Sequence, residues 1–213
     1  MKIEFKKSGG RYLLFLSFVP FVLFVVLSVI IFGSDLVKSF DTFLVGKISE
    51  ARSEPLLAFF LLVTEFGGAR VIFVSLFLLF FILIFSKEFK AAFVLVATMS
   101  ALAVSIYLLK EAFHRPRPEF AYILENGYSY PSAHAAISLA FYGSVAYLFC
   151  KREVSKPMKL FVWSVVAVLT ALVGASRVYL GVHFPSDVIG GYLVGLFWLL
   201  IAAALTDRGR AGG

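Results

Sequence analysis

Long apolar runs alternate with short polar segments along this chain, and this pattern restricts the fold more than any other feature. Six runs are long enough, or nearly so, to cross a bilayer as a helix of about 20 residues. Hydrophobic side chains make up 61% of the 213 residues, whereas a soluble domain is closer to half apolar. The bilayer core offers no water to backbone groups, so each run is expected to be helical. The sequence predicts an all-α, polytopic membrane protein with six transmembrane helices in a bundle, forming a single domain over residues 1–213.

The predicted spans differ in length, and the second and fifth are short. They are Tyr12–Phe32, Val71–Ser86, Ala91–Leu109, Ala133–Cys150, Leu160–Ala175 and Val188–Leu205. Pro20 predicts a kink in the first span. That span is too long for a typical signal-peptide core, so an uncleaved anchor is expected. A shorter apolar piece, Leu56–Thr64, precedes Gly67 and Gly68 and reads as either a half-helix or an interfacial segment.

The distribution of charge predicts the orientation of these spans. With the N-terminus inside, the inside segments carry 12 basic and four acidic residues, and the outside segments carry eight basic and nine acidic residues. Basic residues in short loops favour the cytoplasmic side. The net charge of +7 therefore reports orientation, and no nucleic-acid partner is needed to explain it. We expect a multi-pass protein of the cell membrane with both termini in the cytoplasm.

Three polar segments then fall on the outer side, where they form one group. They are KEAFHRPRP at 110–118, YPSAH at 130–134 and SRVYLGVHFPSDV at 176–188. Together they supply the candidate site residues, which are Lys110, Arg115, Arg117, Ser132, His134, Arg177, His183 and Asp187. Ionisable residues at a membrane are costly and usually functional. The outer segment from Gly33 to Arg70 is either an amphipathic helix lying on the membrane or a connecting loop.

The residue types in these segments suit an anionic phosphate. Arginine presents a planar fork that matches phosphate oxygens, and lysine adds a compact charge. Ser132 precedes an apolar helical run, where a serine N-cap is favoured and free backbone N–H groups attract anions. Pro116 and Pro118 restrict the backbone on both sides of Arg117. The sequence therefore predicts a preorganised phosphate cradle.

Two histidines of these segments, His134 and His183, predict nucleophilic catalysis. His183 and Asp187 are four residues apart and can pair if the segment turns helically, which would make His183 more basic and fix its tautomer. His134 could donate a proton to the leaving oxygen. The sequence has no carboxylate cluster for magnesium and no zinc-ligand spacing, so no metal and no cofactor are expected. Cys150 is the only cysteine and is expected to pack between helices.

At these residues the sequence resembles the type-2 phosphatidic acid phosphatase family of membrane lipid phosphatases. The family pattern K-x6-R-P is met by Lys110, Arg117 and Pro118. P-S-G-H is met by Pro131, Ser132 and His134, with Ala133 in place of glycine, and S-R-x5-H-x3-D is met in full by Ser176, Arg177, His183 and Asp187. Arg115 and His114 lie outside the matched positions and remain neighbours of the site. Tyr128, Tyr130 and Trp198 are interpreted as membrane-interface aromatics.

The resemblance implies a role for each matched residue. His183 would be the nucleophile of a phosphohistidine intermediate, oriented by Asp187, and His134 the general acid. The phosphate would be held by Lys110, Arg117, Ser132, Ala133 through its N–H, and Arg177. Ala133 would distort the cradle only if the backbone there needed positive φ; a helical start is expected instead.

We expect an enzyme that removes a terminal phosphate from a membrane lipid at the outer face. Phosphatidic acid, phosphatidylglycerophosphate, diacylglycerol pyrophosphate and polyprenyl pyrophosphate are all compatible with these motifs. One alternative is a lipid phosphotransferase with an acceptor other than water. Another is a lipid-phosphate binding or transport protein without catalysis. The sequence predicts the lipid bilayer as its surroundings and leaves the oligomeric state open.

Overall fold

The protein is described here by a computed structural model that covers residues 9–207. Within these residues the chain forms eight α-helices and no strand. The helices are α1 Gly9–Gly33, α2 Asp35–Glu50, α3 Glu54–Glu65, α4 Ala69–Phe85, α5 Phe89–Phe113, α6 Ala133–Cys150, α7 Lys156–Tyr179 and α8 Pro185–Asp207. The basic residues Lys2, Lys6, Lys7, Arg208 and Arg210, which contribute to the orientation argument, lie outside the described residues.

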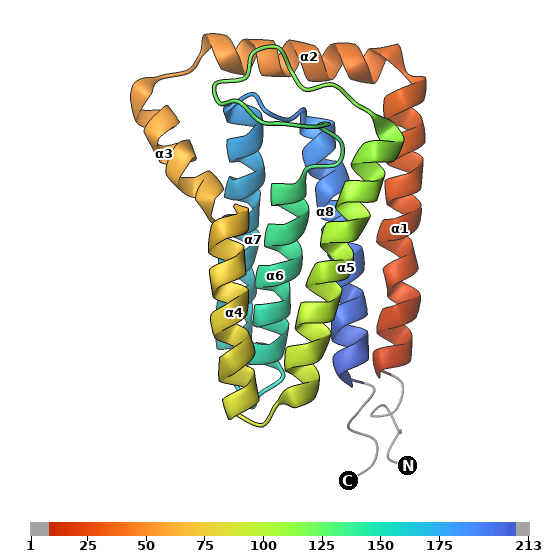
Figure 1. Cartoon of the computed structure of the whole chain (residues 1–213), viewed down its shortest axis with the longest axis vertical. Helices are drawn as coiled ribbons and strands as arrows, with labels where there is room; N and C mark the ends of the chain where they lie inside the picture. Colours follow the sequence, from red (N-terminus) through yellow and green to blue (C-terminus); the bar gives the residue numbers. More distant parts are fainter. Residues whose placement is uncertain (1–8, 208–213) are drawn as a thin grey trace.

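The helices form a bundle with six candidate membrane spans, as the sequence predicts. The spans are α1, α3 together with α4, α5, α6, α7 and α8. In Figure 1 these run along the bundle, α2 lies across one end, and the start of α1 and the end of α8 lie at the opposite end. Helix α1 continues through Pro20. The second and fifth spans are longer than the sequence indicates, at Glu54–Phe85 and Lys156–Tyr179.

The short apolar piece before the second span is α3, which forms one candidate span together with α4. The half-helix interpretation therefore describes it better than the interfacial one. The two helices meet at an angle in Figure 1, at the bend around Gly67. A Cβ atom on Gly67 would lie 2.6 Å from Val173 Cγ1 and 3.2 Å from His134 Cβ. The glycine thus allows the junction to approach α6 and α7 at the level of the candidate site.

The stretch that follows α1 is helical, so the expectation of a plain connecting loop is wrong for residues 35–50. Helix α2 exposes an apolar face, on which Leu36, Phe40 and Phe43 are 79%, 56% and 59% exposed. These residues recur at helical spacing, so they lie on one side of α2. Asp41 and Val45 are buried on the other side, against the bundle. This division is typical of a helix lying in the membrane interface.

Helix α8 packs closely against α6, and two glycines make the approach possible. A Cβ atom on Gly191 would lie 2.4 Å from the Ser132 carbonyl oxygen, and one on Gly195 would lie 2.5 Å from that of Ala136. Small residues four apart let membrane helices approach until their backbones touch. The consequence for the site is direct, because this contact fixes the start of α6 beside the start of α8. The backbone N–H of Ser132 donates to the carbonyl oxygen of Asp187 at 3.0 Å.

Candidate active site

The three polar segments meet at the end of the bundle that carries α2. The loop of residues 114–132 joins α5 to α6 there, and the turn of residues 180–184 joins α7 to α8 (Figure 1). The two connections are tied by a hydrogen bond from the Tyr122 N–H to the Leu180 carbonyl, at 2.8 Å. Chain segments far apart in sequence thus bring the candidate residues to one end of the bundle. The start of α1 at Gly9 and the end of α8 at Asp207 lie at the opposite end.

His183 and Asp187 face each other across the first turn of α8. The His183 Nδ1 atom lies 3.4 Å from Asp187 Oδ2, a long contact for a hydrogen bond. The same carboxylate oxygen accepts the Phe184 N–H at 2.9 Å. Both side chains are almost completely buried. The helical turn that the four-residue spacing requires is therefore present.

The tautomer of His183 follows from its second neighbour. Arg117 Nη1 lies 3.3 Å from His183 Nε2, and a guanidinium can only donate. Nε2 is therefore the acceptor, and the ring proton is on Nδ1, facing Asp187. Burial lowers the pKa of His183 to about 4, although the hydrogen bond and charge of Asp187 oppose that shift. The imidazole is neutral at pH 7, with its Nε2 lone pair turned away from Asp187.

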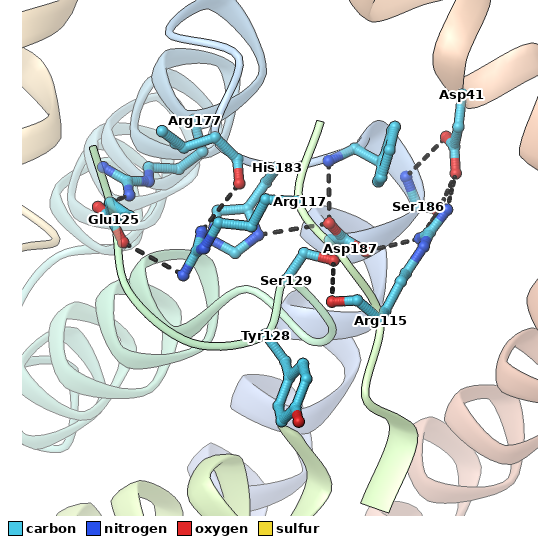
Figure 2. Close-up of polar contacts among 12 residues, drawn as sticks. Asp41, Arg115, Arg117, Glu125, Tyr128, Ser129, Arg177, His183, Ser186 and Asp187 are labelled. Atoms are coloured by element: carbon cyan, nitrogen blue, oxygen red, sulfur yellow. Dashed lines mark hydrogen bonds and ion pairs between the residues drawn. The ribbon is translucent and has the colours of Figure 1, made fainter. Parts of the chain in front are cut away.

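Arg115 joins the His183–Asp187 pair to α2, a contact that the sequence analysis did not predict. Its Nη1 atom lies 2.6 Å from Asp187 Oδ1, and its Nη2 atom lies 2.8 Å from Asp41 Oδ2. The Ser186 hydroxyl accepts a hydrogen bond from Arg115 Nη1 at 2.7 Å. Its backbone N–H and its hydroxyl both donate to the Asp41 carboxylate. Phe184 covers the guanidinium, with its ring centre 4.4 Å away. Figure 2 shows Arg115 between the two carboxylates.

This cluster is buried, so its charges depend on each other. The side chains of Arg115, Asp41 and Asp187 are 7%, 2% and 0% exposed. A buried cation between two carboxylates compensates charges that would otherwise be costly to bury. The only sign in the sequence that a cation links these carboxylates was Arg115, the first arginine of Arg-Pro-Arg-Pro. Asp41 lay in a segment that had no assigned function.

Two further arginines converge on the other side of His183. Arg177 is buried, and its Nη1 atom donates to Thr64 Oγ1 at 2.7 Å. Its Nη2 atom forms an ion pair with Glu125. Arg117 lies 3.4 Å from the same carboxylate and donates to the Val182 carbonyl at 2.9 Å. Figure 2 shows the Glu125 side chain reaching both guanidinium groups.

Glu125 and Thr64 were both missed by the sequence analysis. Glu125 belongs to the loop between α5 and α6, and Thr64 to the end of α3. Burial opposes ionisation of Glu125, but the arginines outweigh it and the pKa of this carboxyl is lowered. Glu125 is therefore an anion at neutral pH. Nothing in the local sequence of either residue indicates these contacts, which depend on how the helices assemble.

Three buried donors have no hydrogen-bond partner among the described residues. One is Arg52 Nη2, and the other two belong to candidate site residues, Ser132 Oγ and Arg177 Nε. Ser132 occupies the N-cap position of α6, but its side chain makes no capping bond, unlike the cap that the sequence predicts. Unpaired buried polar groups are costly and call for an explanation. Ser132 Oγ and Arg177 Nε are both donors of the kind that bind phosphate oxygens.

Ala133, which replaces the glycine of the family motif, begins α6 with helical backbone. Lys87 and His114 are the described non-glycine residues with positive φ, so Ala133 is unstrained. Its N–H belongs to the first turn of α6, where free N–H groups point towards an anion. The departure from the family motif leaves this donor in place. The expected helical start is therefore what the structure has.

Lys110 and His134 lie at the ends of α5 and α6 that face this group. Lys110 Nζ donates to the carbonyl of Tyr128 and lies 3.5 Å from that of Ser129. It is thus held against the loop of residues 114–132 and still interacts electrostatically with Arg117. His134 is half-buried and within electrostatic range of His183, Arg177, Glu125 and Arg117. The structure thus brings the eight candidate site residues to this end of the bundle.

The interface interpretation of Tyr130 is wrong. Tyr130 is completely buried, stacks on Phe24 with ring centres 5.7 Å apart, and shares a 2.8 Å hydrogen bond with Ser28. Burial raises its pKa to about 12, so it stays neutral. Its ring packs beneath the site residues at the start of α6. A tyrosine whose hydroxyl finds a partner can be buried in this way.

Comparisons with known proteins agree with this arrangement. A sequence model described as the PAP2 superfamily matches residues 89–210, more than half of the chain. The chain is 38% identical over 104 residues to phosphatidylglycerophosphatase B of Bacillus subtilis, a match that covers 47% of this chain and 51% of that protein. It is 31% identical over 135 residues to an undecaprenyl-diphosphatase of Sulfolobus acidocaldarius, covering 60% of this chain and 61% of that protein. The match thus spans about half to three-fifths of these relatives.

The fold has a similar solved structure. It is the crystal structure of a transmembrane PAP2-type phosphatidylglycerolphosphate phosphatase from Bacillus subtilis, with a TM-score of 0.85 and 25% identity. The similarity covers 92% of this chain and 98% of that one. The matched region begins with α5 and includes all three polar segments. By its sequence and its helical arrangement, the chain belongs to the PAP2 superfamily.

Proposed function

We propose that this protein hydrolyses the terminal phosphate of a membrane lipid phosphate or pyrophosphate through a phosphohistidine on His183. The observation that carries the proposal is one juxtaposition. A neutral imidazole whose Nε2 atom faces Arg117 lies beside arginines that suit a phosphate, and Ser132 and Arg177 each keep an unpartnered donor. Nucleophile and anion site must be adjacent for phosphoryl transfer, which relies mainly on positioning and charge stabilisation.

The first half-reaction would transfer the phosphoryl group to His183. Its Nε2 atom attacks phosphorus, a P–N bond forms and the P–O bond to the leaving group breaks. The ring proton stays on His183 Nδ1 and is donated to Asp187, whose carboxylate stabilises the positive charge that develops on the imidazole. His134 donates a proton to the leaving oxygen. Arg117 and Arg177, with Ser132 Oγ and the Ala133 N–H, would stabilise the equatorial oxygens.

The second half-reaction would release inorganic phosphate. Water attacks the phosphohistidine in line, the P–N bond breaks and His134 accepts a proton from the water. His183 returns to its neutral tautomer. A different acceptor in place of water would give a lipid phosphotransferase, because the first half-reaction is the same. A third candidate, a lipid-phosphate binding or transport protein, would need neither histidine to react.

The surroundings of the site support a lipid substrate. A cavity of about 290 Å³ is lined by residues including Phe113, Arg115 and Phe184, the residue after His183. A second cavity, of about 270 Å³, is lined almost entirely by apolar residues of α1, α5 and α8. Apolar lining of this kind suits acyl or prenyl chains. The names of the relatives point to phosphatidylglycerophosphate and a polyprenyl diphosphate as the first substrates to test.

The proposed chemistry uses this chain's own cations and no metal. Among residues 9–207, no group of three or more His, Cys, Asp or Glu side chains could hold a metal ion. Lys110, Arg117 and Arg177 would balance the phosphate charge instead. We further propose that the site faces the outer side of the cell membrane with both termini in the cytoplasm. The asymmetry of basic residues between the two ends of the bundle supports this orientation.

Phosphate release from lipids tests the proposal. Purified protein in detergent is given phosphatidic acid, phosphatidylglycerophosphate, diacylglycerol pyrophosphate and undecaprenyl pyrophosphate, with and without EDTA. His183→Gln serves as the inactive control, and lipid binding is measured in parallel. We expect release that EDTA leaves unchanged and the variant lacks. Equal release by the variant contradicts the role of His183, and binding without release favours the transport alternative.

A further inference from the structure

The carboxylate of Glu125 lies where the arginines of the cradle converge. It forms an ion pair with Arg177 and lies 3.4 Å from Arg117 Nη2. We propose that Glu125 is an internal substitute for the substrate phosphate, which neutralises these arginines in the empty site and is displaced when a phosphate binds. This inference concerns the site of the proposed function and rests on it. It makes Glu125 a residue that sets which anions can enter.

The contacts of Glu125 resemble those of a ligand more than those of a structural ion pair. One carboxylate oxygen contacts Arg177 and the other contacts Arg117, and these two arginines come from different segments. Carboxylate and phosphate oxygens share the geometry that a guanidinium fork binds. Arg177 Nε and Ser132 Oγ, which belong to the candidate phosphate-binding residues, have no hydrogen-bond partner among residues 9–207. A carboxylate has two oxygens, so it cannot satisfy all the donors that a phosphate could.

Burial explains why the empty site needs an anion. The Arg177 side chain is 1% exposed, and its other partner, Thr64, is neutral. Arg117 is close enough to repel the positive charge of Arg177. Buried charges without a counter-ion are strongly unfavourable. Glu125 supplies that counter-ion in the absence of substrate.

The position of Glu125 also allows it to leave. Its side chain is 26% exposed, and it belongs to the loop of residues 114–132, where helix backbone does not hold it. The neighbouring Asn126 is exposed and Gly127 has positive φ. The carboxylate can therefore rotate towards solvent without displacing a helix. An incoming phosphate would replace it on both arginines.

As a consequence, an anion binds at the site only if its interaction with the arginines is stronger than that of Glu125. A ligand has to compete with a tethered carboxylate that is always present at the site. A phosphate monoester dianion has a larger charge and more oxygens, so it engages the arginines together with the unpartnered donors. A monoanion with two oxygens gains nothing over Glu125. Glu125 thus favours terminal phosphates over the carboxylate and phosphodiester groups that membrane lipids also present.

Calorimetric titration of the full-length protein in detergent with inorganic phosphate tests this inference. Glu125→Gln keeps the shape of the side chain and removes its charge. We expect its Kd for phosphate to fall by about tenfold or more, which corresponds to about 1.4 kcal/mol of lost competition. Glu119→Gln is the matched control, since Glu119 is an exposed glutamate of the same loop, and its Kd should equal that of the wild type.

Further arms separate the possible outcomes. Glu125→Asp keeps the charge on a shorter chain, so its Kd should lie between those of the wild type and Glu125→Gln, and it remains informative if the glutamine variant fails to fold. An unchanged or raised Kd in Glu125→Gln overturns the inference, because a purely structural partner would weaken the site when removed. KM for phosphatidylglycerophosphate, measured alongside, extends the comparison from free phosphate to a lipid. If the wild type binds phosphate but hydrolyses no lipid, the proposed function fails while the titration still decides the role of Glu125.

Discussion

Replacing Ser132 by alanine separates a phosphate ligand from a helix cap, because the two roles predict opposite changes in stability. The Ser132 hydroxyl is buried and has no partner among the described residues. An unsatisfied buried polar group costs about 1–3 kcal/mol, so Ser132→Ala should raise the free energy of unfolding by about 1 kcal/mol. Phosphate should bind more weakly, since a hydrogen bond to a charged group contributes about 1.5–3 kcal/mol. That range corresponds to a roughly 10- to 100-fold higher Kd.

Helix α7 provides the matched control. Ser155 is its N-cap, and the Ser155 hydroxyl accepts the Met158 N–H at 3.4 Å. Ser155→Ala should destabilise the protein by about 0.5–2 kcal/mol and leave phosphate binding unchanged. Chemical unfolding in detergent and calorimetric titration with inorganic phosphate measure both quantities. If Ser132→Ala loses stability as Ser155→Ala does, or binds phosphate as the wild type does, the reasoning is wrong.

Three further predictions concern the buried charges and the helix contact. Arg115→Gln should destabilise the protein by about 3–5 kcal/mol, because it leaves buried carboxylates uncompensated; Asp41→Asn added to it should recover part of that loss in a double-mutant cycle. Because the pKa of His183 is lowered to about 4 from about 6.5 in the unfolded chain, only the unfolded state gains this proton as the pH falls below 6.5. The wild type should therefore lose about 2–3 kcal/mol more than His183→Gln between pH 7 and pH 4.5, and equal losses would contradict the buried neutral imidazole. Gly191→Ala should destabilise by about 1–3 kcal/mol through overpacking and lower phosphate release, whereas Gly33→Ala, with open space around its Cβ position, should do neither.

Hydropathy was sufficient to predict the six spans, because the length of an apolar run directly reflects the thickness of the bilayer. The polar segments could be assigned to one end of the bundle because alternate loops of a polytopic chain lie on the same side. Their spacing predicted the His183–Asp187 pair, since residues four apart meet on a helical turn. These inferences use local sequence and chain direction only.

The missed residues depend on contacts between distant segments. Asp41 and Glu125 lie in stretches of mixed charge, which are usually solvated, and nothing local shows that each meets a buried arginine. Arg115 looked like a neighbour of Arg117, yet alternate residues of the Arg-Pro-Arg-Pro stretch point to different partners. The cap expected of Ser132 failed for a related reason. The backbone of Ser132 is held by the packing of α6 on α8, where its N–H donates to the Asp187 carbonyl, and sequence spacing does not reveal this contact.

The central claim is that His183 carries the phosphoryl group, and trapping that intermediate tests it most directly. The protein is mixed briefly with a lipid substrate whose terminal phosphate is radiolabelled, quenched in alkali and separated from lipid. A phosphohistidine survives alkali and is lost in mild acid. We expect the wild type to carry such a label and His183→Gln to carry none. Label of the same stability on His183→Gln, or rapid turnover by a wild type that never becomes labelled, would contradict the mechanism.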